Sequence, residues 1–286
     1  MKFKECLEKF NVEKATELMK HGKTQAYIGE IFGIDAQRVC DCFKYYGIKF
    51  IRRTFYVNDE YFDNIDSEDK AYTLGFLVAD GCVKKEERKT GFSYRVSFNN
   101  SIDDKEAIDL IHSKVCPEAK IVIPKNLYNR RKKPQYCLQW SSEHMFNTLS
   151  SYNIKPRKTY DKEFKLPDEL LSDELWRHFI RGFFDGDGHV GDETVEFIFT
   201  SEPFMSQVMS WFANFNYRSY HIDGETTDYW KVVIDAPRKV KSCIYHYLYD
   251  NSTYYLSRKK DCFNTEISYS LKIKTIDIVE HRVEKI

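Results

Sequence analysis

The stretch AYTLGFLVADGCV, residues 71–83, returns in altered form as HFIRGFFDGDGHV, residues 178–190. A single offset of 107 positions (187 − 80) places Asp80 on Asp187 and also aligns the flanking glycines, aromatic residues and valines. Self-similarity at one fixed spacing indicates a duplicated structural unit. We therefore predict that most of the chain consists of two copies of one supersecondary unit.

Both copies continue with the same succession of patterns. An alternating apolar segment is followed by a helical one, then by two more alternating segments and a last helix. The fold class that we predict is α+β, with two pseudo-symmetric αββαββα repeats. Outside the repeated helix, the expected strands are 95–100, 120–124, 135–140, 195–201, 217–222 and 229–235, and the expected helices are 103–115, 142–152, 202–215 and 238–249.

The start of the chain has a different organisation, because residues 4–50 read as short helices separated by turns. Gly22, Gly33 and Gly47 stand where helices should end, and Asp35 stands where a helix should begin. We divide the chain into a small all-α domain at 1–55, a first repeat at 56–160, a second repeat at 161–264 and a C-terminal extension at 265–286. The linker between the repeats is the Lys- and Pro-rich stretch 154–167.

The segment TQAYIGEIFGIDAQRVCDCFKYYGI, residues 24–48, resembles the bacterial helix-turn-helix family. The resemblance implies a small core of inward-facing residues: Ala26, Ile28, Ile31, Ile34, Val39 and Phe43. It also implies that the exposed face of the third helix enters a DNA major groove, with Gln37, Arg38, Asp41 and Lys44. Arg52 and Arg53 would then reach the phosphate backbone. The alternative is an ordinary three-helix cap with no DNA contact.

Composition excludes several classes of protein. Of 286 residues, 42% are hydrophobic and 31% are charged, which excludes a disordered chain, and no apolar run approaches the roughly 20 residues of a membrane span. The charged start MKFKECLEKF is unlike a signal peptide, so we expect a soluble cytoplasmic protein without membrane contact. Eight cysteines lack a CxxC pair, which argues against a zinc site or a disulfide framework. The 44 basic and 44 acidic residues balance, so nucleic-acid binding would require local clustering of charge.

The repeated helices predict a metal site. Gly75 and Ala79 form a small-residue stripe on one helix, so the two helices can pack backbone to backbone and bring Asp80 and Asp187 together. Carboxylates at helix C-termini are unfavourable, and each also repels the other. A divalent cation would remove both penalties, and Mg²⁺, or Mn²⁺, suits so small a set of oxygen ligands. The alternative is that Gly-Asp-Gly simply ends a helix.

The two motifs, TLGFLVADG (73–81) and IRGFFDGDG (180–188), resemble the LAGLIDADG motif of homing endonucleases. Val78 departs from the family pattern, which has an acid there, but the later acid that binds metal in the family is present in both copies. Over residues 60–264, the resemblance implies a monomeric two-repeat nuclease that lays a four-stranded sheet of each half along the DNA major groove. It further implies metal-dependent hydrolysis of both strands, with Asp80 and Asp187 as ligands.

The resemblance also implies further catalytic residues around the two acids. Lys158 and Lys259 stand where the family carries a basic residue near each cut, and Asn100 and Ser201 stand at strand ends that hold water in the family. Surface solvation is the alternative for all four. Further DNA contacts are expected from strand residues and from a basic run that could equally be a solvated hairpin tip: Lys84, Lys85, Arg88, Arg95, Arg130, Arg131, Lys132 and Lys133.

The sequence thus predicts a site-specific, intron-encoded double-strand DNA endonuclease with a long asymmetric target. Two alternatives stay open. One is a transcription regulator that uses the same fold without catalysis, which the presence of both acids disfavours. The other is a maturase that binds intron RNA.

Overall fold

The computed structural model describes residues 2–89, 91–124 and 133–263. This part of the chain divides into two compact units. The first comprises the described residues up to Asn58 together with His112–Lys120, and the second comprises Asp59–Ile111 and the described residues from Ile121 onward.

Four short helices build the beginning of the first unit, and their ends lie where turn and cap residues predict them. Thr24 and Asp35 accept hydrogen bonds from backbone N–H groups in the first turns of the third and fourth helices, at 3.2 and 2.9 Å. Gly33 ends the third helix with a φ of 65°, a conformation that favours glycine. The helices are α1 (Phe3–Lys9), α2 (Val12–Lys20), α3 (Gln25–Phe32) and α4 (Ala36–Tyr45).

The core of these helices corrects one expectation. Ile28, Ile34, Val39 and Phe43 are buried as predicted. Ala26 is exposed, and Ile31 is 41% exposed, because the inward stripe of α3 passes through Ile28 and Gly29 instead.

The second unit contains the two repeats, each of which begins with one long helix that leads directly into a strand. Its elements in the first repeat are α5 (Glu68–Asp80), β1 (Gly81–Arg88), β2 (Gly91–Ser101), η1 (Ile102–Asp104), α6 (Lys105–Val115, whose last turn falls in the first unit), β3 (Gln135–Ser141) and α7 (Glu143–Ser151). After η2 (Lys158–Tyr160) come α8 (Asp173–Asp187), β4 (Gly188–Val190), β5 (Thr194–Phe199), α9 (Glu202–Met209), η3 (Ser210–Phe212), β6 (Tyr217–Ile222), β7 (Tyr229–Asp235), α10 (Arg238–Tyr249) and α11 (Ser257–Asp261).

Each repeat forms one antiparallel sheet, but the two sheets differ in size. The second has the predicted four strands in the order β4-β5-β7-β6, whereas the first has three described strands in the order β1-β2-β3. The strand expected at 120–124 is reduced, within the described residues, to a single bridge from Val122 to Cys137. Pro124 lacks a backbone N–H for a ladder, and Val122 and Ile123 are about half exposed, at 50% and 49%.

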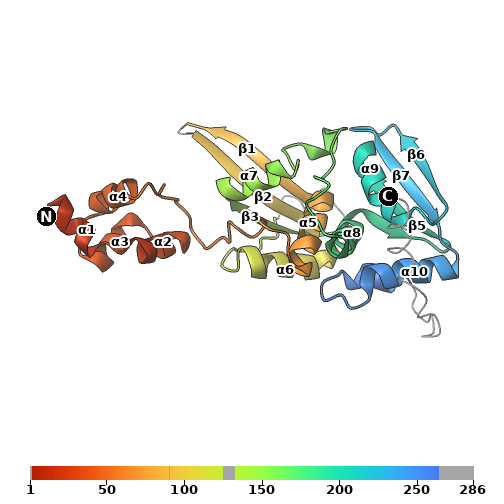
Figure 1. Cartoon of the computed structure of the whole chain (residues 1–286), viewed down its shortest axis with the longest axis horizontal. Coiled ribbons are helices and arrows are strands. Elements are labelled where there is room, and N and C mark those ends of the chain that lie inside the picture. The colour runs from red at the N-terminus through yellow and green to blue at the C-terminus, as the bar shows by residue number, and fades with distance from the viewer. Residues whose placement is uncertain (1, 90, 125–132, 264–286) are drawn as a thin grey trace. The chain divides into compact units, whose positions relative to one another are not determined.

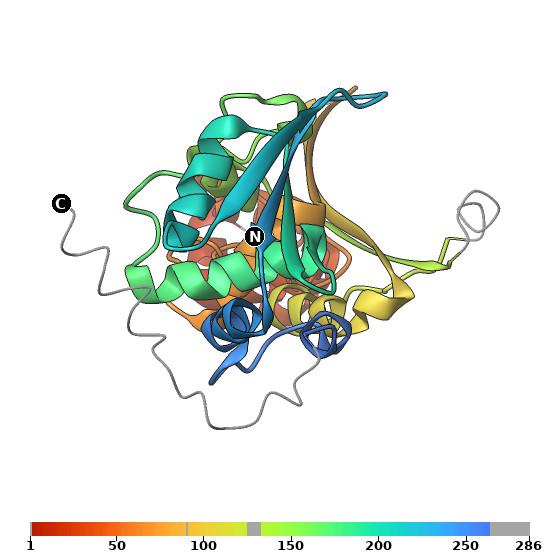
Figure 2. The same cartoon turned by 90° about the vertical axis from the view of Figure 1, so that its right-hand side faces the viewer.

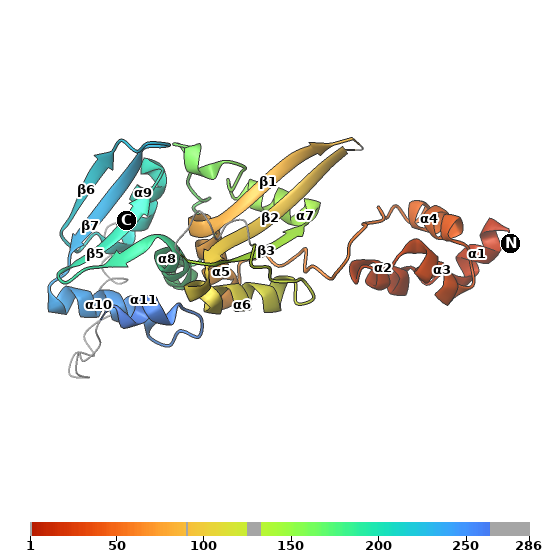
Figure 3. The same ribbon diagram turned by 180° about the vertical axis from the view of Figure 1, so that it is seen from behind.

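The centre of the second unit is the pair of helices α5 and α8, which lie side by side between the two sheets (Figure 1). Helices α6, α10 and α11 all lie on one side of this pair (Figures 2 and 3). Aromatic residues join helix to sheet on both sides: Phe76 of α5 stacks on Phe98 of β2, and Phe184 of α8 contacts Phe197 of β5. The many aromatic residues therefore serve chiefly as core.

Two further observations bear on protein class. All eight cysteines lie in the described ranges and are free thiols, and three of them are buried: Cys6, Cys42 and Cys116. Among the described residues, no helix has both the length and the apolar character needed to cross a bilayer.

Candidate functional site

The site begins with a close approach of two helix backbones. A Cβ atom on Gly75 would lie 2.0 Å from the carbonyl oxygen of Phe179, and one on Gly182 would lie 2.0 Å from that of Tyr72. Real Cβ contacts are essentially never below 3.0 Å, so no residue larger than glycine fits at either position. The predicted backbone-to-backbone pairing of the repeated helices is confirmed.

This pairing brings together the two ends of the helices that carry the acids. Asp80 is the last residue of α5, and Asp187 is the last residue of α8. The Asp80 Oδ2 atom lies only 3.2 Å from the position that a Cβ on Gly186 would take, so this carboxylate faces the final turn of the opposite helix. Asp80 and Asp187, the two acids of the repeated motif, therefore lie together at the C-terminal ends of α5 and α8.

Asn100 orients the first acid. Its Nδ2 atom donates a hydrogen bond of 2.8 Å to Asp80 Oδ2, and the side chain is almost fully buried, at 4% exposure. Its Oδ1 atom is buried without a hydrogen-bond partner in the described structure. Asn100 thus lies beside Asp80, near the acids as the sequence predicted.

The second acid has no equivalent of this amide, and the strand register gives the reason. Gly81 pairs with Phe98, and Gly188 pairs with Phe197, so the counterpart of Asn100 is Phe199. The assignment of Ser201 is therefore wrong. It lies two residues further on, where its hydroxyl donates to Phe164 O at 2.5 Å and caps α9.

Two lysines flank the acids, one from each repeat. Lys158 Nζ donates to the carbonyl oxygen of Ala79, at 3.4 Å, and Lys259 Nζ donates to that of Gly188. These carbonyls belong to the residues directly before Asp80 and directly after Asp187. The structure brings both predicted lysines to the acids, although each binds a backbone oxygen instead of a carboxylate.

The electrostatics follow from this crowding. Removal of water by the surrounding protein raises the pKa of Asp187 to about 7, the charge of Asp80 raises it further, and the two lysines oppose the rise. The pKa of Asp80 is also raised by desolvation, although its side chain keeps contact with solvent, and the Asn100 hydrogen bond counteracts this. Desolvation lowers the pKa of both lysines, against the pull of the acids.

These residues fit a divalent cation. Within the described ranges, no hydrogen bond or ion pair reaches the carboxylate of Asp187, and the lysines leave the oxygens of both acids available. Two neighbouring carboxylates at helix C-termini repel each other and the helix dipoles, a penalty that a hard cation would remove. Asp80 and Asp187 are the residues that would hold such an ion.

A polar sheet face continues outward from the acids. Because alternate residues of a strand point to opposite faces, the register places Lys84, Arg88 and Arg95 on the face away from the buried Val83. Glu86 lies among them and pairs with Arg88 at 2.5 Å and with Arg95 at 3.1 Å. This face therefore carries less net positive charge than the sequence alone indicates.

One basic residue of the same strand lies on the other face. Lys85 shares the face of Val83 and Tyr94, and its ammonium group lies 4.3 Å from the ring centre of Phe92. Lys85 was predicted to contact DNA together with Lys84, but strand alternation places these two side chains on opposite faces of the sheet. The cation–π contact explains why a lysine is accommodated there.

The second sheet also has a polar face, which the sequence analysis overlooked. Lys231 pairs with Glu196 at 2.7 Å, and Arg218 pairs with Asp235 at 2.6 Å. By register these four residues lie opposite the face of the buried Phe197. The alternation of polar and apolar residues in YWKVVID (229–235) and YRSYHI (217–222) could have predicted this polar face.

The remaining candidates lie apart from the acids in sequence. On α4, Gln37 and Lys44 are exposed, while Arg38 pairs with Asp41 at 3.5 Å. Arg52 is exposed and Arg53 is half-buried in the same unit. Of the basic run, Lys133 pairs with Asp103 at 2.5 Å, whereas the others lie outside the described residues: Arg130, Arg131 and Lys132.

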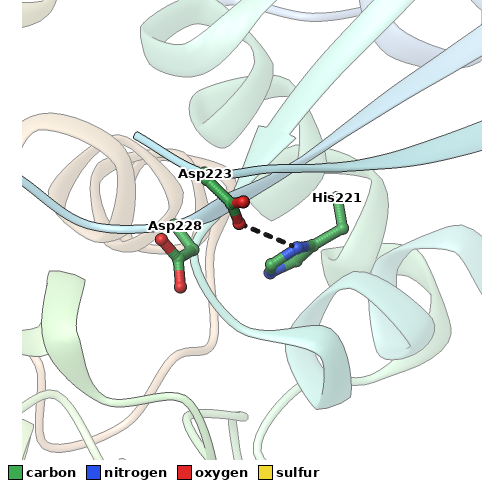
Figure 4. A group of neighbouring side chains, drawn as sticks. All are labelled: His221, Asp223 and Asp228. Atoms are coloured by element: carbon green, nitrogen blue, oxygen red, sulfur yellow. Dashed lines mark ion pairs between the residues drawn. The ribbon is translucent and has the colours of Figure 1, made fainter. Parts of the chain in front are cut away.

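A second group of potential metal ligands lies at the β6–β7 turn (Figure 4). One ligand atom each from His221, Asp223 and Asp228 lies within 4.8 Å of the others. His221 and Asp223 are exposed and form an ion pair of 3.6 Å. An exposed pair at a turn needs no metal to explain it.

Residues 174–255 match a family model described as the LAGLIDADG-like domain. This match covers α8, its acid and the whole four-stranded sheet of the second repeat. Most of the second repeat is therefore similar to a LAGLIDADG-like domain.

No curated protein matches the chain. Among solved structures, I-DmoI in complex with DNA and Ca is 17% identical, with a TM-score of 0.48, covering 69% of this chain and 97% of that one. The I-SmaMI LAGLIDADG homing endonuclease bound to cleaved DNA is 12% identical, with a TM-score of 0.44, covering 70% and 88%.

Proposed function

We propose that this protein is a site-specific DNA endonuclease that hydrolyses phosphodiesters in both strands of a long asymmetric target, acting as a monomer. The observation that carries the proposal is the meeting of Asp80 and Asp187, one acid from each repeat, at the ends of two helices in backbone contact. The LAGLIDADG-like match of residues 174–255 supports the same function.

In the proposed reaction, Asp80 and Asp187 would hold a divalent cation, Mg²⁺ or Mn²⁺, and a bound cation would supply neutralisation of charge on the scissile phosphate. Asn100 fixes the orientation of the Asp80 carboxylate through its 2.8 Å hydrogen bond. Lys158 and Lys259 bring positive charge to the two ends of the site, where it favours an approaching phosphate. Each repeat would thereby serve one strand.

The polar faces of the two sheets are the proposed DNA-binding surface. Lys84, Arg88 and Arg95 lie on one and Arg218 and Lys231 on the other. Contacts of these side chains to phosphates position a duplex, whereas contacts to base edges read its sequence. The first unit, through Gln37, Arg38, Lys44, Arg52 and Arg53, is proposed to extend the site as a helix-turn-helix module.

The test is selection from a randomised duplex library, first with Mg²⁺ and then with Ca²⁺, sequencing bound and cleaved molecules separately. Cleavage at one long asymmetric sequence is expected with Mg²⁺. Asp80→Asn and Asp187→Asn should bind the selected DNA but not cut it, and the exposed Glu169→Gln serves as a matched control that cuts normally.

Two outcomes would overturn the proposal. Unchanged cleavage by both Asp variants would refute the assignment of the acids. Binding without cleavage in either ion would instead favour the transcription regulator or the RNA maturase, and competition between duplex DNA and structured RNA would then separate these two.

A further inference from the structure

The second repeat holds its lysine in a way that the first repeat does not. Leu256, Ser257, Arg258 and Lys259 are consecutive, and each is bound by a different partner. Three of these partners are carboxylates that the proposed chemistry does not use. They are Asp185, Glu106 and Asp104.

Asp185 is the innermost of the three. It is fully buried, and its Oδ2 atom accepts hydrogen bonds from the backbone N–H of Leu256, at 2.7 Å, and from the hydroxyl of Tyr72, at 2.8 Å. Its Oδ1 atom accepts a third bond from Tyr249, also at 2.8 Å. A buried carboxylate is tolerated only when such donors satisfy it, so this position is closely defined.

The other two carboxylates come from the first repeat. Glu106 accepts from the backbone N–H of Ser257 at 2.6 Å, and Asp104 accepts from Arg258 Nε at 2.7 Å. Asp104 is itself buried, at 5% exposure. The short helix α11 is therefore held by both repeats just before Lys259, which is 9% exposed and reaches Gly188 O.

Lys158 lacks this support. The position equivalent to Asp185 in the first repeat is Val78, which has no hydrogen-bonding side chain. Among residues 155–158 of the described structure, Lys158 alone donates a hydrogen bond beyond the linker, and that bond is a long one of 3.4 Å. The two lysines are thus positioned by different means.

We infer that Asp185, Glu106 and Asp104 form a carboxylate clamp that positions Lys259 beside Asp187, and that the strand served by the second repeat depends on this clamp while the other strand does not. These three are positioning residues, since they act through Lys259. The strand dependence rests on the proposed endonuclease function, but the positioning itself does not.

The first experiment measures positioning in the metal-free, full-length protein. The rate at which an amine-reactive acetylating reagent modifies each lysine is followed by peptide mass spectrometry. Asp185→Asn and Glu106→Gln should each raise the rate at Lys259 roughly tenfold, the loss expected when a hydrogen bond to a charged group is weakened, and leave Lys158 unchanged. Tyr249→Phe is the matched control, because it removes one bond to Asp185 but keeps the anchor of Leu256.

Equal rates at Lys259 in wild type and both variants would overturn the clamp, as would an equal rise at Lys158. If Asp185→Asn does not fold, hydrogen exchange in the wild type decides. The Leu256 amide should then exchange as slowly as amides within α8, and fast exchange would refute its anchoring.

The second experiment uses a selected target with each strand labelled separately. Asp185→Asn should slow cutting of one strand by about tenfold or more while the other changes little, so that nicked DNA accumulates. In a Lys259→Met background, Asp185→Asn should have no further effect. Equal slowing of both strands would overturn the inference. If the wild type does not cut at all, the proposed function fails while the acetylation result still decides the clamp.

Discussion

Replacing Gly182 by alanine should damage both stability and the arrangement of the two acids. The added Cβ would lie 2.0 Å from the carbonyl oxygen of Tyr72, whereas ordinary contacts begin at 3.4 Å. The helices would have to separate by more than about 1 Å here, because the obstacle is backbone and cannot rotate away. Overpacking of this kind costs about 3 kcal/mol, against about 1 kcal/mol gained from the helix propensity of alanine.

We therefore expect Gly182→Ala to lower the free energy of unfolding by about 2 kcal/mol, which corresponds to a fall in Tm of about 4–8 °C for a unit of this size. Urea and thermal unfolding, followed by circular dichroism, measure both. The same shift should reduce cleavage strongly, because a displacement of about 1 Å at a reacting centre can cost about a hundredfold in rate.

A neighbouring pair of residues supplies the control. A Cβ on Gly186 would lie 2.4 Å from the Cβ of Ala79, a side-chain atom that can be removed. Gly186→Ala should therefore be destabilising alone and largely rescued by Ala79→Gly, which transfers the methyl group from one helix to the other. A Gly182→Ala protein within about 0.5 kcal/mol of wild type, or no rescue in the pair, would refute the argument from backbone contact.

Three more predictions concern other parts of the molecule. Burial beside Arg181 lowers the pKa of His178 to about 4, so between about pH 6.5 and 4 this residue binds a proton in the unfolded chain but not in the folded chain. The contribution of His178 to stability therefore falls as the pH falls. In urea titrations, His178→Asn should lose less stability than the wild type between about pH 6.5 and 4, and an equal loss would contradict the prediction. Asn100→Ala should slow cleavage about 10- to 100-fold, with unequal effects on the two strands, whereas Ser201→Ala should cost only about 1 kcal/mol of stability because a helix cap is lost. Cleavage assays that follow each strand separately distinguish the two variants, and a catalytic defect in Ser201→Ala alone would show that Ser201, and not Asn100, belongs to the site. Deleting residues 1–53 should shorten the DNase footprint but preserve cleavage, and an unchanged footprint would remove the first unit from the DNA-binding surface.

The features that could be predicted from the sequence are those that recur or act locally. The repeated motif predicted the close packing of the two helices at Gly75 and at Gly182 and the convergence of Asp80 and Asp187, because a duplicated helix with a small-residue stripe has one close way to pack on its copy. Helix ends at Gly33 and Asp35 were equally predictable, since caps depend on neighbouring residues alone.

The features that could not be predicted from the sequence depend on strand register and on contacts between distant residues. Ser201 and Asn100 both follow a strand, yet only the pairing of Gly188 with Phe197 shows that Phe199 occupies the second position. Lys85 lies beside Lys84 in sequence and on the opposite face in space. The clamp on Lys259 joins residues more than 70 positions apart, from Asp185 to Leu256.

The two acids and their duplication could thus be predicted from the sequence, because composition and repetition are properties of the chain. The structure decided that the two halves are unequal. Asp80 has an amide beside it and Asp187 does not, while Lys259 is clamped by carboxylates from both repeats and Lys158 is not. Such differences arise from contacts between side chains that are distant in the sequence, and these contacts cannot be predicted from sequence spacing.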